Sequence, residues 1–217
     1  MKNYDLIIFD WDGTLMDSIG RILGCLRNVA REMGLHQPPE SALRDIIGMS
    51  LEQAMLTLFP DRPETEYPLL QQSYRDNYQR QAHIAIPLYQ GIPELLSSLQ
   101  QQDYQLAVAT GKSRPGLDRS LAQTGLLPFF SHSRCADEAH SKPHPDMLQQ
   151  LLAVTGVAAP RALMIGDSML DMQMAHAAGV AAVGVSYGAH SREQLQSQHP
   201  KQIINEPLAL LPWLQQP

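Results

Sequence analysis

Short apolar runs alternate with segments of helical period through the C-terminal part of the chain. The runs at Tyr104–Ala109, Ala162–Ile165 and Ala181–Val185 have the length of buried strands. The segments between them place apolar residues three and four positions apart, as helices with one buried face do. This alternation predicts an α/β fold, a Rossmann-like doubly wound parallel sheet with helices on both faces.

The same two periods predict the remaining elements. A continuous apolar run makes Tyr4–Asp10 a buried strand, and shorter strands are expected at Phe129–Ser133 and Ile203–Ile204. A short helix should close the chain. Further helices are expected at Ser18–Met33, Glu40–Ile47, Leu51–Phe59, Glu64–Ala82, Ile92–Gln101, Arg114–Thr124, Pro145–Val154, Met169–Ala178 and Ser191–Gln198.

The segment after the first strand has a different character from the rest. Between residues 15 and 85 the sequence shows helical period and no strand pattern. We therefore predict two domains: an α/β core made of residues 1–14 and 87–217, and an inserted α-helical cap made of residues 15–86.

Composition excludes several classes of protein. The 217-residue chain carries a formal charge of -6 and shows no basic stripe, so no nucleic-acid partner is expected. Its two cysteines, Cys25 and Cys135, are far apart, which fits a reducing compartment. Neither a signal peptide nor a membrane span is indicated, so we expect a cytoplasmic protein with no membrane partner.

Polar residues follow the predicted strands where each strand ends. Ligands of open parallel sheets bind at the carboxyl ends of the strands, so these residues should meet at one edge. Their types suit phosphoryl transfer, in which a carboxylate attacks phosphorus, a second group handles the proton and a cation offsets negative charge. Mg²⁺ would relieve the repulsion among the acids. The residues are Asp10, Asp12, Thr110, Gly111, Lys112, Lys142, Asp167 and Asp171.

Four motifs in these positions carry a family resemblance. The chain reads DWDGT from Asp10, TGK from Thr110, KPHP from Lys142 and GDSMLD from Gly166. This order resembles the haloacid dehalogenase-like (HAD) hydrolase superfamily, in its subclass with a helical cap, and is similar to phosphoglycolate-phosphatase-like members. Any one motif occurs by chance, whereas four in order, each at a strand end or helix start, form a specific signal.

The resemblance implies three catalytic residues. Asp10 would be the nucleophile and, through its carboxylate, a Mg²⁺ ligand. Asp12 would act as general acid and base, while its backbone carbonyl touches the metal. Lys142 would offset the charge of Asp10 and of the phosphoryl group.

The resemblance also implies binding roles for four more residues. Thr110 and the amide of Gly111 would bind phosphoryl oxygens. Asp167 would be a metal ligand together with Asp10 and Asp12, and Asp171 would orient metal-bound water or Lys142. Taken singly, Asp171 would also suit a helix N-terminus and Thr110 a helix cap.

The motifs favour one reaction of the family over the others. The resemblance implies that dehalogenases usually lack the second acid, which is present here as Asp12. Phosphosugar mutases typically carry a histidine twelve positions after the nucleophile, where this chain has Ile22. The expected activity is therefore a Mg²⁺-dependent phosphatase for a small phosphorylated metabolite, acting as a monomer or homodimer. The alternatives are such a mutase or a non-catalytic protein that senses phosphate or Mg²⁺.

One departure from the phosphatase pattern concerns the second motif. Similar phosphatases more often have Thr-Asn or Thr-Ser where this chain has Thr110-Gly111. Glycine keeps the backbone amide and lacks a side-chain donor, so contacts to the leaving group should differ from those of phosphoglycolate phosphatases. We expect the cap to set specificity through the loop Ile47–Leu51 and through polar residues such as Arg21 and Arg75.

A second group of polar residues runs from the segment after the second motif into the third motif. His132, Cys135, His140 and His144 suggest zinc, but their spacing matches no common zinc pattern, and a loop near the rim of the site is the preferred interpretation. His176 is expected to pack on a helix. The methionines at 164, 169, 172 and 174 are expected to fill the core.

Overall fold

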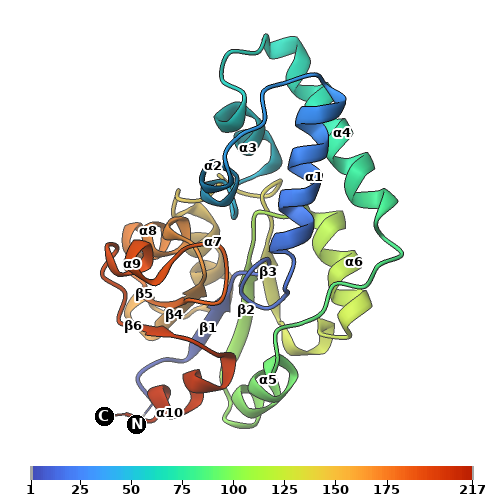
Figure 1. The fold of residues 1–217 in the computed structure, drawn as a ribbon. Helices are drawn as coiled ribbons and strands as arrows, with labels where there is room; N and C mark the ends of the chain where they lie inside the picture. The colour runs from blue at the N-terminus through green and yellow to red at the C-terminus, as the bar shows by residue number, and fades with distance from the viewer. Residues whose placement is uncertain (1, 217) are drawn as a thin grey trace.

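A six-stranded parallel sheet forms the centre of the molecule in the computed structural model, which describes residues 2–216 (Figure 1). The strand order is β3-β2-β1-β4-β5-β6, so the chain winds outward from the central strand β1 in both directions. This topology confirms the predicted doubly wound α/β fold. The strands are β1 (Leu6–Phe9), β2 (Gln105–Ala109), β3 (His132–Arg134), β4 (Ala162–Gly166), β5 (Ala181–Val185) and β6 (Gln202–Ile204).

Alternation along β1 divides the core into two layers. Ile7, Phe9 and, beyond the strand, Trp11 belong to one apolar cluster, whereas Leu6 and Ile8 belong to another on the opposite face. The first cluster is covered by α5 (Ile92–Gln101), α6 (Arg114–Thr124) and α10 (Leu210–Leu214). The second is covered by α7 (Asp146–Thr155), α8 (Met169–Ala177) and α9 (Arg192–Gln196).

Four helices inserted after β1 pack on one another and form a third apolar cluster (Figure 1). They are α1 (Ile19–Glu32), α2 (Glu40–Asp45), α3 (Leu51–Leu58) and α4 (Tyr67–Arg80). The long helices α1 and α4 lie side by side, and the chain between them forms the shorter helices α2 and α3, which lie beside the pair (Figure 1). Within residues 2–216 this cluster includes one residue from the sheet domain, Ala189, so the helices have a core largely of their own.

The two chain segments that connect these helices to the sheet run side by side. Met16 and Leu88 form an antiparallel bridge, and the N–H of Asp17 donates to the carbonyl of Pro87 over 2.9 Å. This paired connection lies beside the predicted boundaries of the cap at 15–86. The division into cap and core stays a prediction, and the ends of the predicted core, Met1 and Pro217, lie outside the described residues.

Several boundaries and one side chain differ from the expectations. The strand expected at Phe129–Ser133 lies at His132–Arg134, because Leu127–Phe129 forms a 3-10 turn. His176 is exposed on α8 rather than packed. Met164, Met172 and Met174 are buried in the core as expected, whereas Met169 is only half-buried. Pro207–Ala209, Ala159–Arg161 and Glu64–Glu66 are further 3-10 turns, and the last of these replaces the expected first turn of α4.

Membrane-spanning helices must be both long and apolar. None of the helices within residues 2–216 is long enough and apolar enough to cross a bilayer.

Candidate active site

The register of the sheet brings the predicted residues to one edge. Phe9, at the end of β1, is opposite Val108 of β2 and Ile165 of β4. The chain continues beyond these strand ends to Asp10, Thr110 and Asp167. The N–H of Asp10 still donates to the carbonyl of Ile165 over 2.9 Å, which fixes Asp10 beside the end of β4.

Asp10 is the more deeply placed of the two acids in the first motif, with 1% of its surface exposed. Lys142 Nζ lies 2.9 Å from Asp10 Oδ1, an ion pair that lacks the angle of a hydrogen bond. Both carboxylate oxygens are buried and have no hydrogen-bond partner within residues 2–216. Burial raises the pKa of Asp10 to about 7, against the attraction of Lys142, and the nearby Asp171 and Asp12 add to the rise.

Lys142 is held between two carboxylates. Its ammonium donates to Asp171 Oδ1 over 2.7 Å in addition to its contact with Asp10, and its side chain is fully buried. Burial alone would lower the pKa of Lys142, but the two carboxylates outweigh burial and raise the pKa above its usual value. Lys142 is therefore a permanent cation at the edge of the sheet.

Asp171 combines the two roles that the sequence left open. Its Oδ2 accepts from the Ser168 N–H at 3.1 Å and from Ser168 Oγ at 2.6 Å, and the Ser168 hydroxyl in turn accepts from the Asp171 N–H. This reciprocal capping box starts α8. Because Oδ1 faces Lys142, the same carboxylate caps a helix and positions the buried ammonium.

Asp167 is fixed by groups on both sides of the site. Thr14 Oγ1 donates to its Oδ1 over 3.0 Å, and the N–H of Ala189, in the loop after β5, donates to its Oδ2 over 2.7 Å. A Cβ at Gly13 would lie 2.0 Å from Asp167 Oδ2, and Gly13 has φ of +80°, so only glycine fits there. Burial, followed by repulsion from Asp10 and Asp171, raises the pKa of Asp167 well above its ordinary value.

Three buried carboxylates come together at this edge. Asp10, Asp167 and Asp171 each offer a carboxylate oxygen, and the three oxygens lie within 4.8 Å of one another. The Asp10 oxygens have no hydrogen-bond partner within residues 2–216, and burial, with a smaller contribution from repulsion among the acids, raises the pKa values of Asp10 and Asp167. An all-oxygen donor set suits a hard cation such as Mg²⁺. The residues present therefore fit the metal that the motifs imply.

Asp12 lies in a different environment from Asp10. Its side chain is directed to Ser18 Oγ, which donates to Asp12 Oδ1 over 2.5 Å, and to Lys112 Nζ, which is 2.9 Å from the same oxygen. The side chains of Lys112 and Asp12 keep 11% and 12% of their surface exposed. Lys112 Nζ also lies 5.4 Å from the ring centre of Tyr78 on α4. The Asp12 carboxylate is thus connected to the inserted helices through Ser18 and Lys112. It does not belong to the cluster formed by the other three acids of the site.

Gly111 lies where the inserted helices meet the sheet. A Cβ at this position would lie 2.5 Å from the carbonyl oxygen of Met49 and 2.6 Å from that of Gly48. Thr110 beside it is fully buried, and its hydroxyl accepts from the N–H of Lys112 over 3.2 Å. The absent side chain of Gly111 therefore lets the loop between α2 and α3 close directly over the second motif.

The same loop makes a second contact with the sheet domain. The N–H of Ser50, the N-cap residue of α3, donates to Ser141 Oγ over 2.9 Å. Ser141 directly precedes Lys142, so the loop touches both the second and the third motif. Of the two arginines expected to set specificity, Arg21 lies 5.6 Å from the ring centre of Tyr78, whereas Arg75 is exposed and donates to Gln71 Oε1.

Some residues of the site carried no role in the sequence interpretation. Lys112 is part of the second motif, and its position just after a predicted strand indicated that it would lie near the site, but it was given no role there. Thr14 is the last residue of the first motif and Ser18 comes four positions later, but a hydroxyl near a turn has many other uses. The N–H of Ala189 and the imidazole of His190, which accepts from the Met169 N–H over 2.8 Å, come from a loop without any motif.

The fold and this edge define a class of protein: an α/β protein with a buried aspartate beside a lysine, a cluster of three buried carboxylates and an inserted group of helices. The sequence model of the haloacid dehalogenase-like hydrolase family matches residues 7–185, which is most of the chain. The chain belongs to that family.

Relatives with assigned activities match over almost the full length. A probable phosphatase IndB of Dickeya dadantii is 34% identical over 92% of this chain and 89% of its own. A phosphoglycolate phosphatase of Nitrosococcus oceani is 29% identical over 94% of each chain. Among solved structures, a predicted phosphoglycolate phosphatase from Haemophilus somnus 129PT superposes with a TM-score of 0.86 at 26% identity, covering 99% of this chain and 100% of the other.

Proposed function

We propose that this member of the haloacid dehalogenase-like hydrolase family is a Mg²⁺-dependent phosphatase that hydrolyses a small phosphorylated metabolite through an aspartyl-phosphate. The observation that carries the proposal is Asp10, a buried carboxylate whose Oδ1 is paired with the buried ammonium of Lys142 and whose Oδ2 has no hydrogen-bond partner among the described residues. A carboxylate in that state is available as a nucleophile. The phosphatases among its relatives support the same reaction.

In the first step an Asp10 oxygen attacks phosphorus and the bond from phosphorus to the leaving oxygen breaks. Asp12 gives its proton to that leaving oxygen, so the metabolite departs as a neutral alcohol. Lys142 offsets the charge of the transferring group from the side of Asp10, where its ammonium already lies 2.9 Å from Oδ1.

In the second step water attacks the phosphorus of phospho-Asp10. Asp12 takes the proton from that water, the acyl phosphate bond breaks, and inorganic phosphate and the Asp10 carboxylate are restored. Ser18 and Lys112 hold the Asp12 carboxylate through Oδ1, which leaves Oδ2 to exchange the proton. Thr110, whose hydroxyl donates to no group within residues 2–216, and the Gly111 amide are proposed to bind the phosphoryl oxygens.

Asp10, Asp167 and the backbone carbonyl of Asp12 are the proposed metal ligands, and Asp171 holds Lys142 in place. A bound Mg²⁺ would supply positive charge to the phosphoryl oxygens and to the clustered acids. Thr14 and the Ala189 N–H fix the Asp167 carboxylate for this purpose.

The inserted helices support hydrolysis of a small substrate and argue against the mutase reaction. The loop at Gly48 and Met49 lies directly against Gly111, which leaves little space for a bulky leaving group when the two units are together. Ile22, at the position where mutases typically carry histidine, is buried in the apolar cluster of these helices. A cytoplasmic location and a monomeric or homodimeric state stay predictions from the sequence.

The proposal is tested by phosphate release from a generic aryl phosphate and from a panel of phosphorylated metabolites, with and without Mg²⁺. The wild type should turn over only with the metal, and Asp10→Asn should lose activity by at least about 1000-fold, because the amide is no nucleophile. The matched control is Asp103→Asn, a change of the same type outside the site. Full activity of pure Asp10→Asn would exclude an aspartyl-phosphate at this residue. Failure of the wild type to release phosphate under any metal would favour a phosphate- or Mg²⁺-sensing protein.

A further inference from the structure

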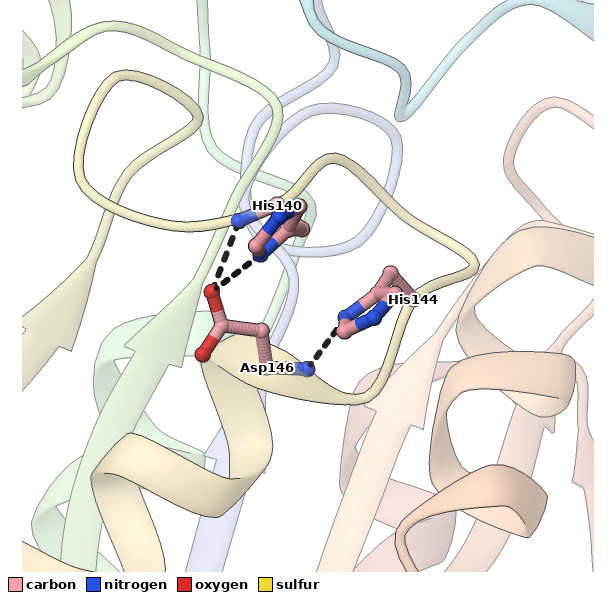
Figure 2. Close-up of side chains that lie close together, drawn as sticks. All are labelled: His140, His144 and Asp146. Atoms are coloured by element: carbon pink, nitrogen blue, oxygen red, sulfur yellow. Dashed lines mark hydrogen bonds and ion pairs between the residues drawn. The ribbon is translucent and has the colours of Figure 1, made fainter.

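A second group of metal-binding side chains lies on the loop that carries Lys142. His140, His144 and Asp146 each offer one ligand atom, and these atoms lie within 4.8 Å of one another. Figure 2 shows the two imidazoles beside each other above the start of α7, with the carboxylate of Asp146 directed to the His140 ring. His132 and Cys135, which the sequence suggested together with them, are not part of this group.

Hydrogen bonds already hold the three side chains in one arrangement. Asp146 Oδ2 is 2.9 Å from both the backbone N–H and the ring Nδ1 of His140. The N–H of Asp146 donates to Nδ1 of His144 over 3.2 Å, and the two ring centres are 4.5 Å apart. Gln150, one turn further along α7, donates to the other oxygen of Asp146 over 3.0 Å. The loop itself therefore holds the three residues close together before any metal binds.

We propose that His140, His144 and Asp146 form a second metal site, which takes a transition-metal ion such as Zn²⁺ and is distinct from the proposed Mg²⁺ site. Two imidazole nitrogens and one carboxylate oxygen are the ligands that Zn²⁺ and its neighbours prefer, whereas Mg²⁺ prefers oxygen alone. Three protein ligands leave a fourth position for water.

Exposure and charge at this position favour binding. Both histidines are exposed, so an ion reaches their ring nitrogens from solvent without any change of the fold. The His140 backbone N–H, followed by Gln150 and the His140 ring, lowers the pKa of Asp146 to about 2, which keeps its carboxylate charged at neutral pH. The metal would replace the direct contacts between these side chains and would use a ring nitrogen from each imidazole.

Binding of an ion at His140 and His144 would constrain the loop that carries Lys142. His140 and His144 lie two residues before and two residues after Lys142, whose ammonium contacts Asp10 and Asp171. An ion bound by both imidazoles closes the five-residue loop around that lysine. Zn²⁺ should therefore slow backbone hydrogen exchange across residues 140–146 and raise the melting temperature, as any ligand of the native state does.

The test is a titration of the full-length protein with Zn²⁺, in excess Mg²⁺, followed by calorimetry and by imidazole ¹⁵N NMR. The wild type should bind one Zn²⁺ that shifts the ring nitrogens of His140 and His144 and leaves those of His132 and His176 unchanged. The double variant His140→Ala/His144→Ala should weaken Zn²⁺ binding by at least about tenfold. Removing a residue that only hydrogen-bonds to a metal ligand already costs about 10- to 100-fold in affinity, so losing two ligands should cost no less. Gln150→Ala should weaken binding by about tenfold through Asp146.

Two controls separate this site from others. His176→Ala removes an exposed histidine of α8 and should leave the Zn²⁺ isotherm unchanged. Asp10→Asn alters the proposed Mg²⁺ site and should also leave it unchanged, whether or not the phosphatase proposal holds. The proposal is overturned if the double histidine variant binds like the wild type, if the ring nitrogens of His140 and His144 do not shift, or if Asp10→Asn abolishes the isotherm.

Discussion

Two lysine–aspartate pairs at the same sheet edge have very different surroundings. Lys142 and Asp10 are fully buried, and the ammonium of Lys142 pairs with carboxylates of the sheet domain. Lys112 and Asp12 keep about a tenth of their side chains exposed and contact Ser18, which precedes α1, and the ring of Tyr78 on α4. The geometry of the first pair is therefore fixed by the sheet domain alone, whereas the geometry of the second pair depends on the position of the inserted helices.

This difference matches the two chemical tasks that we propose. A nucleophile needs an environment that stays the same throughout the reaction, and a buried ammonium without solvent provides it. A group that gives and takes a proton must meet the leaving group and then water, so it benefits from a partly exposed position at the boundary with the inserted helices. The pairs can be separated experimentally, because each lysine can be removed without altering the other.

The largest effect is expected from Lys142→Met, which leaves two buried carboxylates without a cation. Breaking a buried pair in this way costs about 3–5 kcal/mol of the free energy of unfolding. Activity should fall by about 100- to 1000-fold, since the developing charge loses a fixed donor. Urea unfolding and kcat/KM at saturating Mg²⁺ measure both. Lys201→Met, at an exposed lysine, is the control. A Lys142→Met enzyme within tenfold of the wild type would contradict the role of this pair.

The next largest effect is expected from Gly111→Ala, which tests the boundary between the two regions. The added Cβ would lie 2.5 Å from the Met49 carbonyl, so the loop must withdraw from the second motif. A displacement of about 1 Å at a site can cost about 100-fold, and we expect kcat/KM to fall by about 10- to 100-fold. Hydrogen exchange should become faster at residues 47–51, with little change around Lys142.

Gly24→Ala is the matched control for that variant. Gly24 lies inside α1, where an added Cβ meets nothing within 4 Å. Alanine is a better helix former than glycine, so this variant should keep its activity and gain up to about 1 kcal/mol of stability. Unchanged kcat/KM in Gly111→Ala, with unchanged exchange at residues 47–51, would show that the loop does not need the space.

The sheet and its polar edge could be predicted from the sequence because both rest on local patterns. Buried parallel strands are short apolar runs, and the residues after them must meet at one edge, so strand ends alone place Asp10 and Asp167 together. The predicted position of β3 was wrong, because a three-residue strand beside a 3-10 turn contains too few residues to set a period.

The partners of the site residues could not be predicted in the same way. Asp167 is fixed by the backbone N–H of Ala189, and any residue other than proline at that position provides an N–H. The need for glycine at 111 arises from Gly48 and Met49, more than sixty positions earlier, and only the tertiary approach of the loop reveals it. His140 and His144 matched no zinc pattern, because their third partner is the carboxylate of Asp146 and not Cys135.

A smaller effect is expected from Lys112→Met than from Lys142→Met. The Lys112 side chain is 11% exposed, so water can partly replace its ammonium near Asp12, and we expect a loss of about tenfold in kcat/KM. If Lys112 acts together with α4, Tyr78→Leu, which removes the ring beside the ammonium, should lose less activity in the Lys112→Met background than alone. A double-mutant cycle should therefore give a coupling of about 0.5–1 kcal/mol. Strict additivity would show that Asp12 is independent of the inserted helices.

The smallest effect concerns His190, which lies between the two regions. Its ring accepts from the Met169 N–H over 2.8 Å, at the start of α8, and its Nε2 is 3.3 Å from Asp45 of the inserted helices. Burial lowers the pKa of His190 more than the nearby carboxylates raise it, so the folded protein favours the neutral ring. This contribution to stability is present above the ordinary pKa of about 6.5 and is lost as the pH falls below it.

His190→Asn keeps an acceptor for the Met169 N–H and removes the titration. The free energy of unfolding of the wild type should therefore fall relative to that of the variant between about pH 7.5 and about pH 5.5, measured by urea unfolding at fixed ionic strength. His83→Asn, at an exposed histidine, should run parallel to the wild type. If the His190→Asn curve also runs parallel, the ring is protonated as easily in the folded as in the unfolded chain. The contact with Asp45 would then balance the effect of burial, and the inserted helices would influence the charge of His190 as they position Asp12.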